Sequence, residues 1–191
     1  MKNIVVFASG SGTNFQAIID SVRDGKINAS ISGLIASKTG IGAIGRAENS
    51  GIPYHVLPSE NQNDFEDQLL AKLTEWQPDL IVLAGFLKKI PTSIIDRYKD
   101  RIINIHPSLL PKFGGKGFYG MNVHRAVIEA GEKQSGCTVH YVNEQYDRGD
   151  IICQKMVPVT EDDTPETLAK KVLIEEHKLL PEVITKLINA N

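Results

Sequence analysis

The chain has 191 residues, of which 41% are hydrophobic and 23% charged, and this length and composition are typical of one globular domain, here residues 1–191. With 21 basic and 23 acidic side chains its formal charge is −2, which disfavours a dedicated nucleic-acid binder. No apolar run approaches the ~20 residues of a membrane-spanning helix, and two cysteines do not make a disulfide framework, so we expect a cytoplasmic protein with neither nucleic acid nor membrane as partner.

Short apolar runs alternate with helical patterns over the first half of the chain. We predict strands at residues 4–8, 31–35, 54–57 and 80–84, and helices at residues 14–22, 43–49 and 65–76. Strands that alternate with helices usually pair in parallel through crossover connections. This half therefore predicts a parallel sheet.

The second half begins in the same way and then changes character. We predict a helical turn at residues 93–98, a strand at 102–106, a helix at 123–130, and strands at 138–142 and 151–159 whose short polar connection indicates antiparallel pairing. Thr164 and Pro165 open a long final helix, which Pro181 should kink or divide. The whole pattern predicts a three-layer αβα, Rossmann-like α/β fold with a mostly parallel sheet and an antiparallel C-terminal addition.

The strand at residues 102–106 carries the most informative polar side chains. Because side chains two residues apart in a strand share a face, Asn104 and His106 should project together while the intervening isoleucines pack behind them. Pro107 should end the strand at His106, at the carboxyl end where open α/β sheets bind ligands. A carboxylate such as Asp147 would complete a site for acyl transfer. The alternative is that His106 is a packed, hydrogen-bonded residue.

Residues 10–14, Gly-Ser-Gly-Thr-Asn, follow a predicted strand and open a predicted helix. Free backbone N–H groups and the helix dipole at such a position offer a seat for an anion, and a side chain added at Gly12 should intrude on that seat. Phe15 stands where a dinucleotide-binding fingerprint requires glycine, so NAD is not expected. The alternative is a purely structural turn.

Several segments taken together resemble the folate-dependent formyltransferases. They are residues 4–14, 83–86, 102–111 with the run Asn-Ile-His-Pro-Ser-Leu-Leu-Pro, 136–152 with Asp-Arg-Gly-Asp, and 175–177. They span nearly the whole chain in the order that the family has. The resemblance implies the formyltransferase fold and transfer of the formyl group of 10-formyltetrahydrofolate to the amine of glycinamide ribonucleotide, with no metal.

The resemblance also implies roles for individual residues. It makes three residues catalytic, namely Asn104, His106 and Asp147. It assigns the folate to Leu87, Lys88, Lys89, Ile90 and Asn104, and the glycinamide ribonucleotide to Gly12, Thr13, Asn14 and Glu176. The alternatives are a solvated surface for Lys88 and Lys89 and a solvated helix face for Glu176. A basic side chain that the family often has near Gln62 is missing, and we expect His140 to be a buried structural imidazole.

In the expected mechanism the acceptor amine attacks the formyl carbon directly. Asn104 and a protonated His106 stabilise the developing oxyanion, and His106 then protonates the departing folate nitrogen. Asp147 should favour the imidazolium and orient it. Neither Cys137 nor Ser108 has an evident base, so a covalent intermediate is not expected. The glycine-rich residues 112–122 should form a mobile segment beside the site.

Other functions remain open at this point. Methionyl-tRNA formyltransferases, formyltetrahydrofolate hydrolases and sugar-nucleotide formyltransferases share the family, and their usual additional domains distinguish them. An alternative of a different class is a noncatalytic nucleotide-binding module, which binding of folate without turnover would favour. The sequence is compatible with a monomer or a homodimer.

Overall fold

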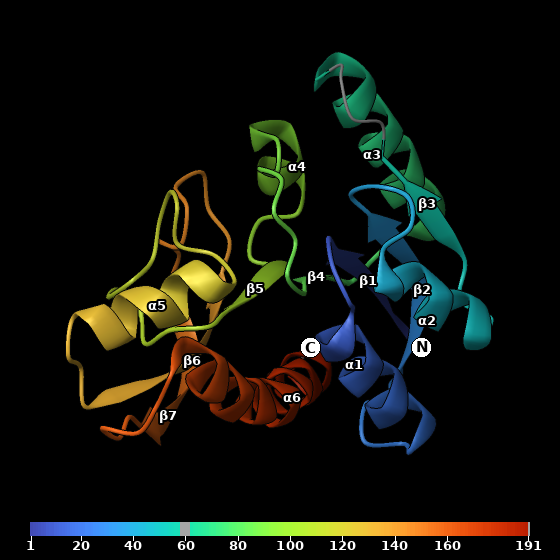
Figure 1. Cartoon of the computed structure of the whole chain (residues 1–191). Helices are drawn as coiled ribbons and strands as arrows, with labels where there is room; N and C mark the ends of the chain where they lie inside the picture. The colour runs from blue at the N-terminus through green and yellow to red at the C-terminus, as the bar shows by residue number, and fades with distance from the viewer. Residues whose placement is uncertain (58–61, 191) are drawn as a thin grey trace.

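A computed structural model describes residues 1–57 and 62–190, without the side chains of Gln62 and Asn63. A seven-stranded sheet lies at its centre (Figure 1). The strands are β1 (Lys2–Ala8), β2 (Ala29–Ala36), β3 (Tyr54–Val56), β4 (Leu80–Leu83), β5 (Ile102–His106), β6 (Gln134–Tyr141) and β7 (Ile151–Pro158). The helices are α1 (Thr13–Arg23), α2 (Gly42–Asn49), α3 (Gln62–Trp76), α4 (Thr92–Arg97), α5 (Met121–Glu129) and α6 (Pro165–Asn189).

The strand order is β3-β2-β1-β4-β5-β6-β7. Strands β1 to β5 pair in parallel, and β6 runs antiparallel to both of its neighbours, which confirms the predicted sheet. The chain leaves β1 toward one edge and returns to β4 on its other side. The loops after these two strands meet, since the Ser9 amide donates to the carbonyl of Gly85 at 3.1 Å. Open α/β sheets bind ligands at such a switch point.

The two faces of the sheet carry separate hydrophobic cores. Along β1, Ile4, Val6 and Ala8 pack with α1, α2, α5 and α6, whereas Val5 and Phe7 pack with α3 and α4. Figure 1 shows α1 and α6 together on one side of the sheet and α3 with α4 on the other. A strand buried on both faces reads as a continuous apolar run. The predicted three-layer arrangement is therefore confirmed.

Two local features differ from the sequence prediction. Strand β6 begins at Gln134, because its first residues pair with β7 as far as Gln134 opposite Pro158, although such polar and glycine residues favour strands only weakly. Pro181 was expected to kink or divide the last helix, and the division is wrong. Helix α6 runs unbroken through the buried Pro181, with Leu180 and Val183 packed into the core on either side.

The two cysteines are free, with Cys137 buried on β6 and Cys153 partly buried on β7. Within residues 1–57 and 62–190, no helix is long and apolar enough to cross a membrane.

Candidate active site

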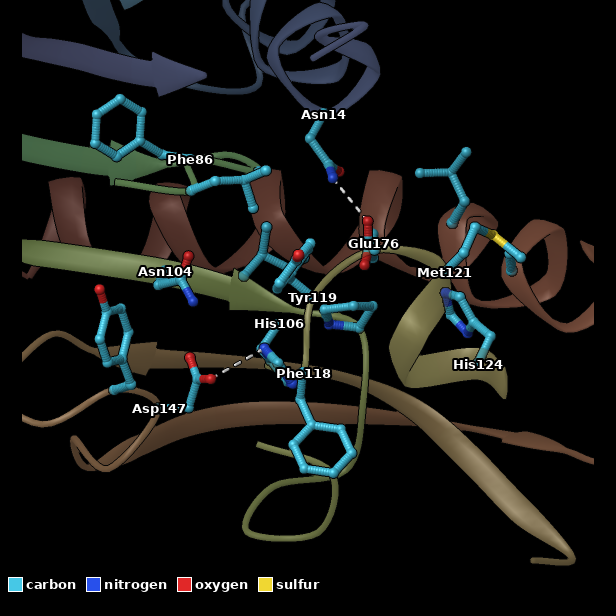
Figure 2. Close-up of a pocket in the computed structure, with 18 of the residues that line it drawn as sticks. Asn14, Phe86, Asn104, His106, Phe118, Tyr119, Met121, His124, Asp147 and Glu176 are labelled. Carbon is cyan, nitrogen blue, oxygen red and sulfur yellow. Dashed lines mark hydrogen bonds and ion pairs between the residues drawn. The ribbon is translucent and has the colours of Figure 1, made fainter. Parts of the chain in front are cut away.

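Strand β5 presents Asn104 and His106 on one face, while Ile103 and Ile105 are buried in the core. The strand ends at His106, as the following proline predicts. Asp147 lies in the loop between β6 and β7, where its backbone has a φ of 54°. This loop brings Asp147 Oδ2 to 3.6 Å from His106 Nδ1 (Figure 2). The three residues that the sequence singled out therefore meet at the carboxyl end of one strand.

The hydrogen bonds of His106 define which ring nitrogen carries a proton. Nε2 lies 2.8 Å from the backbone carbonyl of Phe113, and a carbonyl can only accept, so Nε2 is the donor. In the neutral ring Nδ1 is then the basic nitrogen, and it faces Asp147. A proton gained during a reaction would therefore reside on Nδ1, beside a carboxylate.

Burial and the neighbouring Asp147 act on the charge of His106 in opposite directions. Burial lowers the pKa of His106 below its ordinary value of 6.5, and attraction by Asp147 and the Phe113 carbonyl offsets this only in part. A side chain only 4% exposed loses most of its hydration, which disfavours the charged ring, whereas Asp147 favours it, in the direction expected from the sequence. The lowered pKa favours the neutral ring, whose Nδ1 can take a proton.

Asp147 is held as a carboxylate. Burial alone would raise its pKa, but the neighbouring His140 and His106 rings and the Gly115 amide together bring the pKa below its ordinary value. The Gly115 N–H donates to Oδ2 at 2.8 Å. A Cβ at Gly114 would lie 3.2 Å from the Cβ of Asp147. The absence of a side chain at Gly114 therefore allows the glycine-rich residues 112–122 to approach Asp147. The glycine-rich segment thus contacts the carboxylate directly.

The orientation of Asn104 is set by His140. The Nδ1–H of His140 donates to the carbonyl of Tyr141 at 2.8 Å, and its Nε2 lies 3.1 Å from Asn104 Nδ2 and 3.7 Å from Asp147 Oδ1. An amide nitrogen carries two hydrogens, and one is left for the cavity that Asn104 lines. His140 is 2% exposed, which confirms the predicted buried and satisfied imidazole. It also aims the amide of Asn104.

Two hollows meet at these residues. The larger one, of about 630 Å³, is bounded by residues 10–14 (the glycine loop), α5, α6 and residues 115–121. The smaller, of about 80 Å³, lies between the loop after β4 and the β6–β7 loop. Both are lined by Phe86, Asn104, Tyr146 and Asp147. Two molecules bound in the two hollows would therefore touch each other beside Asn104 and Asp147.

The glycine loop contributes Ser11, Thr13 and Asn14 to the larger hollow. Gly12 has a φ of 73° and lies just before α1, and a Cβ on it would lie 2.7 Å from the Cα of Ala43 in α2. The expectation that a side chain at Gly12 would fill the anion seat is therefore wrong. Gly12 permits close packing against α2, and the neighbouring residues face the cavity.

Glu176 and Asn14 form a buried polar pair on the wall of the larger hollow (Figure 2). Asn14 Nδ2 donates to Glu176 Oε2 at 2.7 Å. Glu176 is 7% exposed, so the alternative of a solvated helix face is wrong, and burial raises the pKa of its carboxyl group to about 7. Asn14 Oδ1 is buried without a hydrogen-bond partner. The pair retains unused hydrogen-bonding capacity.

The residues after β4 divide between the two hollows. Leu87 is 57% exposed and borders the larger one, whereas Lys88, Lys89 and Ile90 line the smaller. The Lys88 ammonium lies 5.2 Å from the centre of the Phe65 ring, so a wholly solvated surface is not its environment. The side chain of Gln62 lies outside the described residues.

Two other nucleophile candidates are unsuited to covalent chemistry. Burial raises the pKa of the Cys137 thiol to about 12, and the Ser108 hydroxyl donates to the carbonyl of Lys112 at 2.7 Å. Within the described part of the chain, no group of three or more His, Cys, Asp or Glu side chains could hold a metal ion.

The structure adds one residue that sequence reasoning missed. His124 of α5 is 5% exposed and lines the larger hollow, and its Nδ1 has no hydrogen-bond partner. It belongs to no motif, and only the packing of α5 beside the cavity reveals it. Residues 115–121 also line the hollow, in keeping with the predicted position of the glycine-rich segment.

Comparisons with known proteins agree with this arrangement. Residues 2–184 match the family model described as formyl transferase. The chain is 39% identical to the phosphoribosylglycinamide formyltransferase of Bacillus subtilis, over 100% of this chain and 97% of that one. It is 44% identical to the chloroplastic enzyme of the same name from Arabidopsis thaliana, over 96% of this chain, and spans only 64% of that protein's length.

A solved structure has the same fold over almost the whole of both chains. The glycinamide ribonucleotide transformylase 1 of Geobacillus kaustophilus matches with a TM-score of 0.91 and 38% identity, covering 98% of this chain and 99% of that one. From the family match and these relatives, we conclude that the chain belongs to the formyl transferase family.

Proposed function

We propose that residues 1–191 form one catalytic domain that transfers the formyl group of 10-formyltetrahydrofolate to the amine of glycinamide ribonucleotide, a step of purine synthesis. The observation that carries the proposal is the meeting of two hollows at Asn104 and Asp147, next to His106. Transfer between two substrates requires their reacting atoms to lie together beside groups that stabilise charge and move a proton. The names of the relatives support phosphoribosylglycinamide as the formyl acceptor, and the resemblance to folate-dependent formyltransferases supports the folate as the donor.

In this proposal the larger hollow takes the acceptor. Its glycine loop lies at the start of α1, where free N–H groups and the helix dipole favour the phosphate. Asn14 and Glu176 would bind the sugar or glycinamide part, because Asn14 Oδ1 is unpaired and Glu176 is buried beside it. The acceptor amine would then point toward Asn104 and His106.

The smaller hollow takes the folate ring. Its lining combines the apolar residues Phe86, Ile90 and Val142 with polar residues from both neighbouring loops, among them Asn143 and Gln145, a mixture that suits a flat heterocycle with polar edges. Lys88 and Lys89 at its rim would offer positive charge to the glutamate tail. Asn104, which lines both hollows, would lie at the formyl group.

The proton path follows from the tautomer of His106. The amine attacks the formyl carbon, and the developing oxyanion accepts the free amide hydrogen of Asn104. The attacking nitrogen becomes positive and gives its proton to His106 Nδ1, where Asp147 stabilises the imidazolium. Nδ1 then returns that proton to the folate nitrogen as the carbon–nitrogen bond to the folate breaks. One proton thus moves from one substrate to the other.

Product identification tests the choice of acceptor. The protein is incubated with 10-formyltetrahydrofolate and a panel containing glycinamide ribonucleotide, its dephosphorylated form, an amino sugar nucleotide and methionyl-tRNA, and formylated products are identified by mass spectrometry. We expect formylation of glycinamide ribonucleotide with equimolar tetrahydrofolate. Formylation of another amine in preference to it would contradict the proposal, and tetrahydrofolate release without any acceptor would indicate a hydrolase.

A further inference from the structure

The wall of the larger hollow contains an imidazole that the reaction proposed above does not use. His124 projects from α5 and lines the larger hollow, which Asn14 and Glu176 also line (Figure 2). It is 5% exposed, and its Nδ1 is buried with no hydrogen-bond partner. Buried polar atoms nearly always have a partner, so an unpaired one on a cavity wall requires an explanation.

His124 is uncharged at neutral pH. Burial, together with the nearby His106, lowers its pKa to about 4. A neutral imidazole offers one hydrogen-bond donor and one acceptor. Such a ring suits a hydroxyl or an amide of a ligand rather than a phosphate, and the seat for an anion lies elsewhere in the hollow, at the start of α1.

The unpaired nitrogen is costly to the free protein. A buried polar atom without a partner loses its hydration and gains nothing in return, whereas an apolar side chain of similar size would pack there without that loss. A role in stability therefore explains His124 poorly. A ligand that supplies the missing hydrogen bond explains it directly.

We propose that His124 is an acceptor-binding residue, whose imidazole hydrogen-bonds an uncharged polar group of the amine acceptor, either a ribose hydroxyl or the glycinamide amide. The inference rests on the proposed function for the identity of the acceptor. His124 lines the larger hollow with Asn14 and Glu176 and does not line the smaller one. It should therefore affect the acceptor and leave the folate unaffected.

The test compares His124→Leu, His124→Gln and a control, His55→Leu. His55 is a histidine on β3 outside both hollows, where its Nε2 pairs with Gln68 at 3.1 Å. In His124→Leu we expect the acceptor KM to rise at least tenfold, the folate KM to change less than twofold, and Tm to equal or exceed that of the wild type. His124→Gln, which keeps a donor and an acceptor, should recover most of the acceptor affinity. His55→Leu should change neither KM.

Other results would overturn the proposal. An unchanged acceptor KM in His124→Leu, an equal rise in both KM values, or a lower Tm that His124→Gln does not restore would each assign His124 a structural role only. Two acceptor analogues locate the contact, one without ribose hydroxyls and one without the amide carbonyl. For one of these analogues the KM of the wild type should exceed its KM for glycinamide ribonucleotide, and in His124→Leu this difference should disappear. The same difference in both proteins would exclude the contact.

A binding measurement separates this inference from the proposed function. The ring nitrogens of His124 are followed by ¹⁵N NMR while glycinamide ribonucleotide is added without folate, so that no turnover is needed. We expect the Nδ1 resonance to shift on addition, and an unchanged resonance at saturation would overturn the inference. If the acceptor binds and shifts His124 but no formyl transfer follows, the proposed function fails and the binding role stands.

Discussion

The buried carboxyl group of Glu176 should make the stability of the protein depend on pH in a way that Glu176→Gln abolishes. Glu176 is 7% exposed, and its one hydrogen bond comes from Asn14. A glutamine has nearly the same shape and can still accept that bond through its carbonyl oxygen. The substitution therefore removes the titration and keeps the packing.

The magnitude follows from the shift in pKa. Burial raises the pKa of Glu176 from 4.5 to about 7, so between these values the unfolded chain releases a proton that the folded chain keeps. Stability relative to unfolding is then highest below pH 4.5 and falls as pH rises toward 7. A shift of about 2.5 units corresponds to roughly 3 kcal/mol in all, of which about 2.5 kcal/mol is lost between pH 5 and pH 8.

Urea unfolding of both proteins at pH 5 and pH 8 measures this effect. Other groups titrate alike in the two proteins, so the difference in unfolding free energy should move by about 2.5 kcal/mol in favour of Glu176→Gln at pH 8. Glu175→Gln, at a neighbouring residue that pairs with Lys178 at 2.7 Å, serves as the control. Parallel pH profiles for the wild type and Glu176→Gln would refute the reasoning.

Four further predictions concern residues at the two hollows and Gly12 beside them. Asn104→Ala should lower kcat by roughly 10²–10³ because an oxyanion donor is lost; a change in folate KM alone would make Asn104 a binding residue only. Asp147→Asn should lower the pKa of His106 further, since a carboxylate that favours the imidazolium is removed; NMR titration of His106 that finds an unchanged or higher pKa would exclude Asp147 as its electrostatic partner. Thr13→Asp places a negative charge on the cavity wall, at a helix start that tolerates acidic residues. The acceptor KM should therefore rise at least tenfold with the folate KM unchanged, and steady-state kinetics that find equal effects on both KM values would contradict this assignment. Gly12→Ala should lower Tm because the added Cβ clashes with α2, and an unaltered Tm would contradict that interpretation.

Periodicity explains why so much of the fold could be predicted. The continuous apolar run of β1 and the alternation of apolar and polar residues in β5 are local properties of the chain. Each can be recognised from the spacing of neighbouring residues alone. The placement of Asn104 and His106 on one face followed from that spacing. The effect of Pro181 on the last helix was harder to predict. The packing of α6 on both sides of this proline stabilises the helix more than the one missing backbone donor destabilises it.

Properties that depend on tertiary packing could not be predicted from the sequence. The resting charge of His106 depends on burial that no motif encodes. The direction of a side chain at Gly12 depends on α2, about thirty residues further along. His124 belongs to the cavity only because α5 packs beside it. In each case a contact between distant segments decides the outcome.

A single-turnover experiment with ¹³C-formyl-labelled 10-formyltetrahydrofolate tests the central claim most directly. Wild-type protein and His106→Ala are mixed with labelled folate and glycinamide ribonucleotide, and the position of the label is followed over time by rapid quench and mass spectrometry. Our account predicts that the label moves to the acceptor amine in step with tetrahydrofolate release, and that His106→Ala slows this transfer by roughly 10²–10⁴ without unfolding. Label recovered as formate, or transfer at the wild-type rate in the variant, would contradict it.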